Sequence, residues 1–349
     1  MNIGIIGAGS IAKYHINAYE KNPLCKVKAI ADLNRDTAAA LAKEYNIPDI
    51  YTDYREMLAD ESIDAVSIVT PTFTHKNIVL DAINAKKHIL CEKPPALNAD
   101  ETRECVQAAK KSGKFFMYAL VCRFRGDVQY VKSYIDSGKM GRILSAEGAR
   151  MASLSKFNGW FNSRAKGGGV LRDAAIHELD LMLYFMGYPK PKTVLAFSDN
   201  SNKDLLNKVR SEIDGWKSAD KNAYERDIED FIRGFVTFES GACLSINATG
   251  VFRISEPRRY VEVNGDMAGA RLWANGGKLE MSEITDDLKE RSFEPETENL
   301  NGYDEEINYF IDCCGGRENT MCPPDEAVRL MEIIDALYKS ADTGLPVVM

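Results

Sequence analysis

The chain has 349 residues, of which 45% are hydrophobic and 28% charged, and its formal net charge at pH 7 is −8. This length favours two domains over one. The acidic balance argues against a surface for nucleic acid or anionic membrane, and no apolar run reaches the roughly 18 residues of a transmembrane helix. The eight cysteines have neither metal-ligand spacing nor a disulfide pattern, so we expect reduced, packed thiols in a cytoplasmic protein.

The chain opens with an apolar strand at Asn2–Ile6, followed by a glycine-rich loop and a helix that extends to about Glu20. The loop reads G-A-G-S-I-A, which matches the dinucleotide fingerprint G-x-G-x-x-G/A with alanine in the third place. Its first glycine permits a tight turn, and its second lets a pyrophosphate approach the backbone at the helix N-terminus. The residues predicted to bind the cofactor here are Gly7, Gly9, Ser10 and Ile11.

The second strand, residues 26–31, ends on Asp32, about 20 residues after the loop. A carboxylate at this position can accept both ribose hydroxyls of NAD, while its charge opposes the 2′-phosphate of NADP. Arg35 lies close enough to leave some tolerance for NADP. We therefore expect NAD as the preferred cofactor, with NADP as the alternative.

Helical patterns then alternate with short strands as far as Leu120, which predicts a parallel sheet with right-handed crossovers. The further strands expected are Ala65–Thr70, His88–Cys91 and Phe115–Leu120. The helices expected are Arg35–Tyr45, Asp53–Leu58, Thr74–Ala85 and Ala99–Lys111.

Two strand ends of this sheet are predicted to face a ligand, because ligands of open α/β sheets bind beyond the carboxyl ends of the strands. After the strand at residues 65–70, the backbone of Thr70, Pro71 and Thr72 is expected to line the cofactor. His75 opens the next helix, and both a cofactor contact and local packing remain open for it.

The second of these ends is His88-Ile-Leu-Cys-Glu-Lys-Pro-Pro95, a strand that finishes on the charged pair Glu92-Lys93. Two prolines stop the strand, because proline cannot donate to a sheet ladder. A lysine held there is well placed to meet a substrate. The alternative is an ordinary solvated ion pair at a strand end.

Beyond Leu120 the strands bunch together, which predicts an α+β domain built on an open, mostly antiparallel sheet. Residues 1–121 form the predicted NAD(P)-binding domain, and residues 122–349 form the predicted substrate-binding and oligomerisation domain. The polar segment 198–225 is expected to be a surface excursion, with a lid or an oligomer contact as alternatives. The expected strands are 142–151, Thr193–Phe197, Asp227–Phe238, Ala242–Gly250, Arg259–Asn264 and Ala270–Trp273, and the expected helices are Asp127–Ser137, Asp304–Cys313 and Pro324–Lys339.

Three glycines, 167–169, precede an apolar stretch at 170–184 that is predicted to be one helix. Asp173, His177 and Asp180 would then lie on one face, at positions i, i+4 and i+7. This pattern indicates either a structural Asp–His hydrogen bond in a core or an acid/base pair facing a cleft, with the glycines giving a substrate close access. The chain has only four histidines and no two have ligand spacing, so no metal site is expected.

Together these motifs resemble the glucose–fructose oxidoreductase / inositol dehydrogenase / rhizopine-catabolism (Gfo/Idh/MocA) family, and the similarity runs through the whole chain. The resemblance implies a Rossmann domain, a second domain whose open sheet often builds homodimers or homotetramers, and NAD(P)-dependent oxidation or reduction of a sugar, inositol or related alcohol. The motifs that carry it are G-x-G-x-x-A, Asp32, Thr70-Pro71-x-x-x-His75, Glu92-Lys93-Pro94, Asp173-x-x-x-His177-x-x-Asp180 and the closing segment 332–344.

By this resemblance Lys93, Asp173 and His177 match the catalytic positions. We expect His177 to accept the hydroxyl proton, Lys93 to donate a hydrogen bond to the reacting oxygen, and Asp173 to hold one of them in place. The weaker candidates for substrate binding are Arg123, Trp160 and Arg164, and Glu92 and Lys93 are also expected to contact the cofactor.

Two other functions stay open at the level of sequence. One is a glycosidase that uses bound NAD for transient oxidation, and the other is a non-catalytic NAD or sugar sensor. The presence of all three residues that match catalytic positions argues against the sensor, because a sensor would not need all three.

Overall fold

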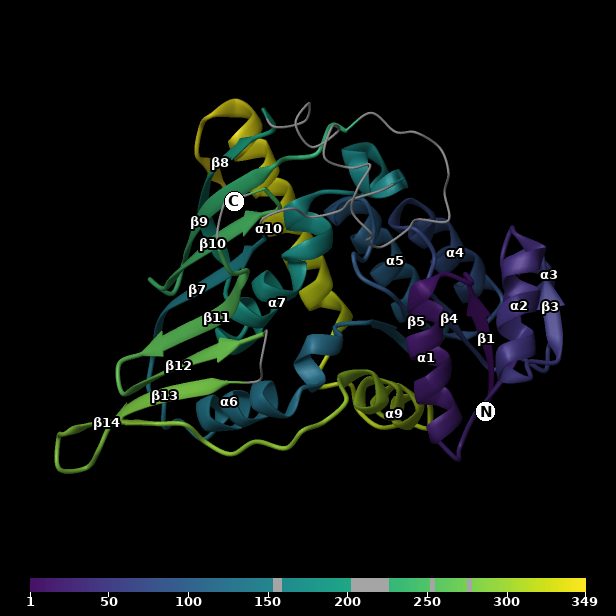
Figure 1. The fold of residues 1–349 in the computed structure, drawn as a ribbon, viewed down its shortest axis with the longest axis horizontal. Coiled ribbons are helices and arrows are strands. Elements are labelled where there is room, and N and C mark those ends of the chain that lie inside the picture. Colours follow the sequence, from purple (N-terminus) through teal and green to yellow (C-terminus); the bar gives the residue numbers. More distant parts are fainter. Residues whose placement is uncertain (153–158, 202–225, 252–254, 275–277) are drawn as a thin grey trace. The chain divides into compact units, whose positions relative to one another are not determined.

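The computed structural model describes residues 1–152, 159–201, 226–251, 255–274 and 278–349. These residues form two compact units, the first made of 1–124 with 300–331 and the second of 125–299 with 332–349 (Figure 1). Most of the segment 198–225, predicted to be a surface excursion, lies outside the described residues. The predicted domain boundary between residues 121 and 122 stays a prediction.

The first unit contains a parallel six-stranded sheet in the order β3-β2-β1-β4-β5-β6 (Figure 1). The parallel sheet predicted from the alternating pattern is confirmed, and its order reverses between β1 and β4, where such sheets bind ligands. The strands are β1 (Asn2–Ile6), β2 (Lys26–Ala31), β3 (Asp49–Tyr51), β4 (Ala65–Ile68), β5 (His88–Cys91) and β6 (Phe116–Tyr118).

The helices of this unit begin and end with local signals that the sequence contains. The side chain of Asn34 accepts the N–H groups of Asp36 and Thr37 at the start of α2, and Asn98 accepts that of Glu101 at the start of α5. The helices are α1 (Ser10–Lys21), α2 (Arg35–Tyr45), α3 (Tyr54–Ala59), α4 (Thr72–Asn84), α5 (Ala99–Ser112) and α9 (Gly302–Cys314), with the first part of α10 (Pro324–Thr343).

Helix α9 brings the late part of the chain back against α1. Tyr303 stacks on Tyr14 with ring centroids 4.9 Å apart, and Lys21 Nζ lies 2.6 Å from an Asp304 carboxylate oxygen. Helix α9 therefore packs against α1, the helix that follows the glycine loop.

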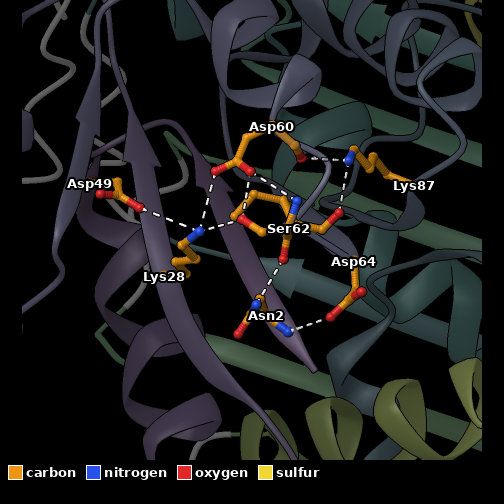
Figure 2. Close-up of polar contacts among 8 residues, drawn as sticks. Asn2, Lys28, Asp49, Asp60, Ser62, Asp64 and Lys87 are labelled. Carbon is orange, nitrogen blue, oxygen red and sulfur yellow. Dashed lines mark hydrogen bonds and ion pairs between the residues drawn. The ribbon is translucent and has the colours of Figure 1, made fainter.

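Polar contacts hold the amino-terminal edge of the same sheet. Figure 2 shows the Asp60 carboxylate beside Lys28, and Lys87 Nζ donating to the carbonyl oxygens of Asp60 and Ile63, both at 2.8 Å. Asn2 contributes a backbone N–H to the carboxylate of Asp64 at 2.7 Å. These contacts satisfy the buried Lys87 ammonium and the loop carbonyls that it meets. The charged residues at this end of the sheet therefore have a structural role.

The second unit contains a nine-stranded sheet in the order β14-β13-β12-β11-β7-β10-β9-β8-β15 (Figure 1). Only the pair of β10 and β7 is parallel among its described neighbours, which confirms the mostly antiparallel prediction. The strands are β7 (Ile143–Met151), β8 (Pro191–Asp199), β9 (Phe231–Phe238), β10 (Cys243–Thr249), β11 (Arg258–Gly265), β12 (Ala268–Trp273), β13 (Leu279–Ile284), β14 (Glu290–Phe293) and β15 (Val347–Val348).

The helices of this unit are α6 (Gly126–Asp136), α7 (Ile176–Phe185) and the last part of α10. Strand β9 begins at Phe231, later than predicted. Arg226 and Asp230, in the segment before it, form a buried ion pair at 2.7 Å. Within the parts of the chain that the structure describes, no helix is both long and apolar enough to cross a membrane.

Candidate active site

The glycine loop after β1 has the geometry that a diphosphate needs. Gly7 has φ +105°, and a Cβ on it would lie 2.8 Å from the carbonyl oxygen of Val69, so a side chain is excluded. Gly9 is the N-cap of α1, makes no side-chain cap, and has nothing within 4 Å of where a Cβ would lie. The first turn, with Ser10 and Ile11, carries no acidic residue, so its N–H groups can donate to an anion.

Asp32 connects this loop to the end of β2. Its Oδ2 accepts the Ala8 N–H at 2.8 Å, and its Oδ1 accepts the Asn34 N–H at 2.8 Å. Each carboxylate oxygen has two lone pairs, and the side chain is half-exposed, so acceptor capacity remains for ribose hydroxyls. Arg35 is exposed at the start of α2.

His75 links the ends of β4 and β5. Its buried ring lies 2.8 Å from the carbonyl oxygen of Thr70 through Nε2 and 2.8 Å from that of Pro94 through Nδ1. Burial lowers the pKa of His75, so the neutral ring donates its one N–H to one carbonyl at a time. These contacts favour local packing for His75, and its predicted cofactor contact stays a prediction.

The loop after β4 supplies further polar groups at the same edge. The hydroxyl groups of Thr70 and Thr74 lie 2.7 Å apart, and Pro71 is the N-cap of α4. The hydroxyl of Thr72 is buried and has no hydrogen-bond partner in the described part of the chain. Thr70–Thr72 therefore follow β4 beside the glycine loop that follows β1, since these two strands are paired neighbours.

Glu92 at the end of β5 is buried and anchored on both oxygens. Oε1 lies 3.0 Å from His15 Nε2, and Oε2 accepts the Lys93 N–H at 3.0 Å. Burial opposes ionisation of Glu92, but its contacts with His15 and Lys93 prevail and lower its pKa. Glu92 is therefore not half of a solvated pair, and the sequence analysis missed His15, whose signal is a histidine on the apolar face of α1 beside Ile16 and Tyr19.

A second buried carboxyl group, Glu306 on α9, was also missed. Its side chain is fully buried, and neither oxygen has a hydrogen-bond partner among the described residues. Burial, and after it the negative charge of Glu92, raise the pKa of Glu306 well above its ordinary value. This unit therefore holds two buried carboxyl groups whose pKa values shift in opposite directions.

In the second unit, the predicted single helix at 170–184 was wrong. Val170–Ala174 form one π-helical turn, Ala175 leaves helical geometry at ψ 3°, and α7 begins at Ile176. Asp173 and His177 thus lie in different segments, and the argument that placed them on one face of a continuous helix fails. Asp180 is buried and accepts the Tyr188 hydroxyl, which gives it a structural role.

The weaker substrate candidates occupy three different environments. Arg123 is fully buried and donates to the Met321 carbonyl at 2.5 Å and the Glu326 carboxylate at 2.6 Å. Trp160 is buried and stacked on its neighbour Phe161, with centroids 3.8 Å apart. Arg164 is half-buried and binds both carboxylate oxygens of Asp342 at 2.8 Å.

The structure thus places the predicted site residues in two sets. The first unit brings the cofactor candidates to the carboxyl edge of one parallel sheet, together with Lys93, which is half-buried. The second unit carries Asp173 and His177, both half-buried, with Trp160 and Arg164 in the segment before the glycines. The contacts reported for Arg123 are those of a structural residue.

Two family models cover most of the chain. Residues 1–120 match an oxidoreductase family with an NAD-binding Rossmann fold, and residues 132–349 match the C-terminal alpha/beta domain of that oxidoreductase family. Both matches agree with the fold seen in the corresponding parts of the structure.

Relatives are similar along nearly the whole chain. The D-glucoside 3-dehydrogenase of Escherichia coli (strain K12) is 30% identical over 358 aligned positions, covering 99% of this chain and 96% of that protein. The levoglucosan dehydrogenase of Pseudarthrobacter phenanthrenivorans is 30% identical over 269 positions, 71% of this chain and 67% of that protein. A solved levoglucosan dehydrogenase with NADH and L-sorbose has a TM-score of 0.85 at 25% identity, covering 100% of this chain and 98% of that chain.

Proposed function

The chain belongs to the Gfo/Idh/MocA oxidoreductase family, and on this premise we propose that it is an NAD(P)-dependent dehydrogenase of a sugar, inositol or sugar derivative. The observation that carries the proposal is the arrangement at the carboxyl edge of the first sheet. An uncapped helix N-terminus follows β1, a carboxylate follows β2, and the anchored Glu92-Lys93 pair follows β5.

The residues at this edge fit a nicotinamide dinucleotide. The open space at Gly9 and the N–H groups of Ser10 and Ile11 suit the diphosphate, and Asp32 suits the ribose hydroxyls. The negative charge of Asp32 favours NAD over NADP, with the exposed Arg35 as the source of any NADP tolerance. When bound, the nicotinamide supplies a two-electron hydride acceptor.

The protein's own part is to orient the substrate and to move one proton. In oxidation, the carbinol C–H bond breaks as a hydride leaves, the O–H proton passes to His177, and the product is a ketone. The Lys93 ammonium donates a hydrogen bond to the oxygen that becomes the carbonyl, which stabilises the negative charge that develops there. Asp173 holds Lys93 or His177 in place and accepts from a neighbouring hydroxyl.

The names of the relatives indicate the class of substrate. A glucoside and an anhydro-sugar are both cyclic polyols with secondary hydroxyl groups, and the relatives named for them resemble this chain along most of its length. We therefore include a ring carbinol of a hexose, glucoside or cyclitol in the proposal. Trp160 and Arg164 remain candidate substrate contacts, whereas we assign no such role to the fully buried Arg123.

A homodimer or homotetramer is also part of the proposal. Leu195 on β8 and Phe235 on β9 are paired across the sheet, both are exposed, and Phe197 extends the patch. Large exposed apolar groups side by side on a sheet are typical of a surface that another protein covers. Light scattering after size exclusion would measure the mass directly, and a monomer at all concentrations would contradict this part of the proposal.

The experiment that tests the activity follows reduced cofactor by absorbance. The protein is mixed with NAD and then NADP across a panel of glucosides, aldoses, anhydro-sugars, inositols and sugar acids. We expect reduction with one group of substrates. Lys93→Ala should lower turnover by several powers of ten and leave NADH affinity nearly unchanged, whereas Lys110→Ala, which removes an exposed lysine paired with Asp325, should change neither.

Two results would redirect the proposal. Cleavage of a glycoside without net cofactor reduction would indicate a redox-assisted glycosidase. Tight NADH binding without any reaction would indicate a sensor. A mild effect of Lys93→Ala on turnover would contradict the role assigned to Lys93.

A further inference from the structure

The π-helical turn that carries Asp173 is held by a buried carboxyl group from elsewhere in the second unit. Glu229, in the segment before β9, accepts the Leu171 N–H at 2.8 Å and the Tyr338 hydroxyl at 2.9 Å, both on Oε1. Glu229 is 6% exposed and Tyr338 is 4% exposed. One carboxyl oxygen therefore connects the turn to α10.

Gly169 brings the backbone into close contact with this pair. A Cβ on Gly169 would lie 2.5 Å from the Tyr338 hydroxyl and 3.1 Å from both oxygens of Glu229, and its φ is +133°. Its carbonyl oxygen accepts the Asp173 N–H at 3.1 Å. The position of Asp173 is thus fixed through a turn that a side chain at residue 169 would push away from Glu229 and Tyr338.

Two arginines fix the ring of Tyr338. The guanidinium of Arg164 lies 4.3 Å from the ring centroid and that of Arg172 lies 5.1 Å from it. Arg172 also donates to the Arg164 carbonyl at 3.1 Å, and Arg164 is held by Asp342 at 2.8 Å. These contacts restrict rotation of the Tyr338 ring, so its hydroxyl stays directed at Glu229.

We propose that Glu229 and Tyr338 are positioning residues for Asp173, acting through the backbone of residues 169–173 without touching substrate or cofactor. This inference rests on the proposed function, in which Asp173 belongs to the catalytic set. Displacements of about 1 Å at a catalytic group can lower turnover by about a hundredfold. The turn is held by the Glu229 oxygen and by the Tyr338 hydroxyl, which also accepts the Arg172 N–H at 3.4 Å, so it is sensitive to the loss of either.

The acceptor role of Glu229 decides which substitutions are informative. Burial raises the pKa of Glu229, and glutamine is the substitute of nearly the same size that keeps an acceptor oxygen. Glu229→Gln keeps an oxygen that accepts from Leu171 and Tyr338, whereas Glu229→Leu has a similar size and no acceptor. Tyr338→Phe keeps the ring between the arginines and removes only the hydroxyl.

The test measures kcat, KM and NADH affinity for these variants, together with hydrogen exchange of residues 167–175. We expect Tyr338→Phe and Glu229→Leu to lower kcat by about 10- to 100-fold, leave NADH affinity within twofold, and speed exchange in 167–175. Glu229→Gln should stay within about threefold of the wild-type kcat. The matched control is Tyr188→Phe, which removes another buried hydroxyl from a carboxylate, Asp180, and should leave kcat within twofold.

Each outcome decides the proposal. Unchanged kcat and unchanged exchange in Tyr338→Phe would overturn it, as would a loss in Glu229→Gln as large as in Glu229→Leu, because an acceptor oxygen at residue 229 would then not be enough to hold the turn. If Glu229→Leu does not fold, Tyr338→Phe still gives the decisive comparison. If the wild-type protein reduces no cofactor with any substrate, the proposed function fails, and the exchange data still decide whether Glu229 and Tyr338 hold the turn.

Discussion

His15 Nε2 lies 3.0 Å from Oε1 of Glu92, and both side chains are buried. This contact connects the helix that follows the glycine loop to the strand end that carries Lys93. The other ring nitrogen of His15 lies 3.3 Å from the Ser67 hydroxyl, which Tyr19 contacts at 2.7 Å. One buried polar network therefore joins α1 to β4 and to the end of β5.

The first prediction concerns His15→Leu, which removes one anchor of the Glu92 carboxylate and leaves the other, the Lys93 N–H. Removing the partner of a hydrogen bond to a charged group typically destabilises a protein by about 1.5–3 kcal/mol. We expect a loss of that order in the free energy of unfolding, measured by urea denaturation. Lys13→Ala on the same helix removes an exposed ion pair to Glu44 and should leave the midpoint unchanged. Equal midpoints for His15→Leu and the wild type would contradict the assigned contact.

The second prediction concerns pH and the neutral acid Glu306. Its folded-state pKa is raised by burial and by Glu92, so the folded protein binds a proton that the unfolded chain releases above its ordinary value of 4.5. Stability from this group is full below pH 4.5 and decreases as pH rises toward the folded pKa. Glu306→Gln should therefore become more stable than the wild type as pH increases from 4.5 to 8.

Urea denaturation at several pH values measures this difference. The control is Glu305→Gln, which makes the same substitution at the neighbouring, half-buried position of α9. A stability difference between Glu306→Gln and the wild type that does not change with pH would show that Glu306 is not held as a neutral acid.

The third prediction tests the contacts of Asp60 at the amino-terminal ends of the strands in the first sheet, shown in Figure 2. Hydrogen bonds from Ser62, and then from Lys28, lower the pKa of Asp60 to about 2. This stabilisation is present above the ordinary value of 3.8 and is lost as pH falls through about 2. Asp60→Asn should therefore lower the thermal midpoint at pH 7, with a smaller difference at pH 3, and should leave kcat unchanged. An altered kcat would mean that this edge is coupled to the reaction.

Local sequence signals predicted the parallel sheet of the first unit, because glycines, strand ends and the alternation of helix and strand act over short distances. Strands β13, β14 and β15 were missed because they lie near the sheet's edges, and β14, Glu290–Phe293, is largely exposed and polar. The break at Ala175 was hidden within a stretch that reads as one helix, since hydrophobic periodicity does not reveal a change from a π-turn to an α-helix.

The polar partners of the candidate site could not be predicted for a different reason. His15 and Glu92 are 77 residues apart, and Glu229 and Tyr338 are 109 residues apart. In the sequence, none of these residues differs from an ordinary side chain on a helix or next to a strand. Only the fold brings a buried carboxyl group to its donor, so the roles of Glu92 and Glu229 depend on tertiary contacts.

The last prediction concerns cofactor choice at Asp32. Asp32→Asn keeps an oxygen that can accept the Ala8 N–H, now 2.8 Å from Oδ2, and removes the charge that repels a 2′-phosphate. We expect the ratio of kcat/KM for NAD to that for NADP to fall by at least about tenfold, a change of about 1.4 kcal/mol in discrimination. Asp36→Asn, which removes a nearby carboxylate from the first turn of α2, should leave the ratio within twofold. Both variants lose one negative charge from neighbouring positions, so a similar fall in the two would mean that the summed charge of this loop, and not Asp32 itself, decides the choice of cofactor. An unchanged ratio in Asp32→Asn would remove Asp32 from the cofactor site.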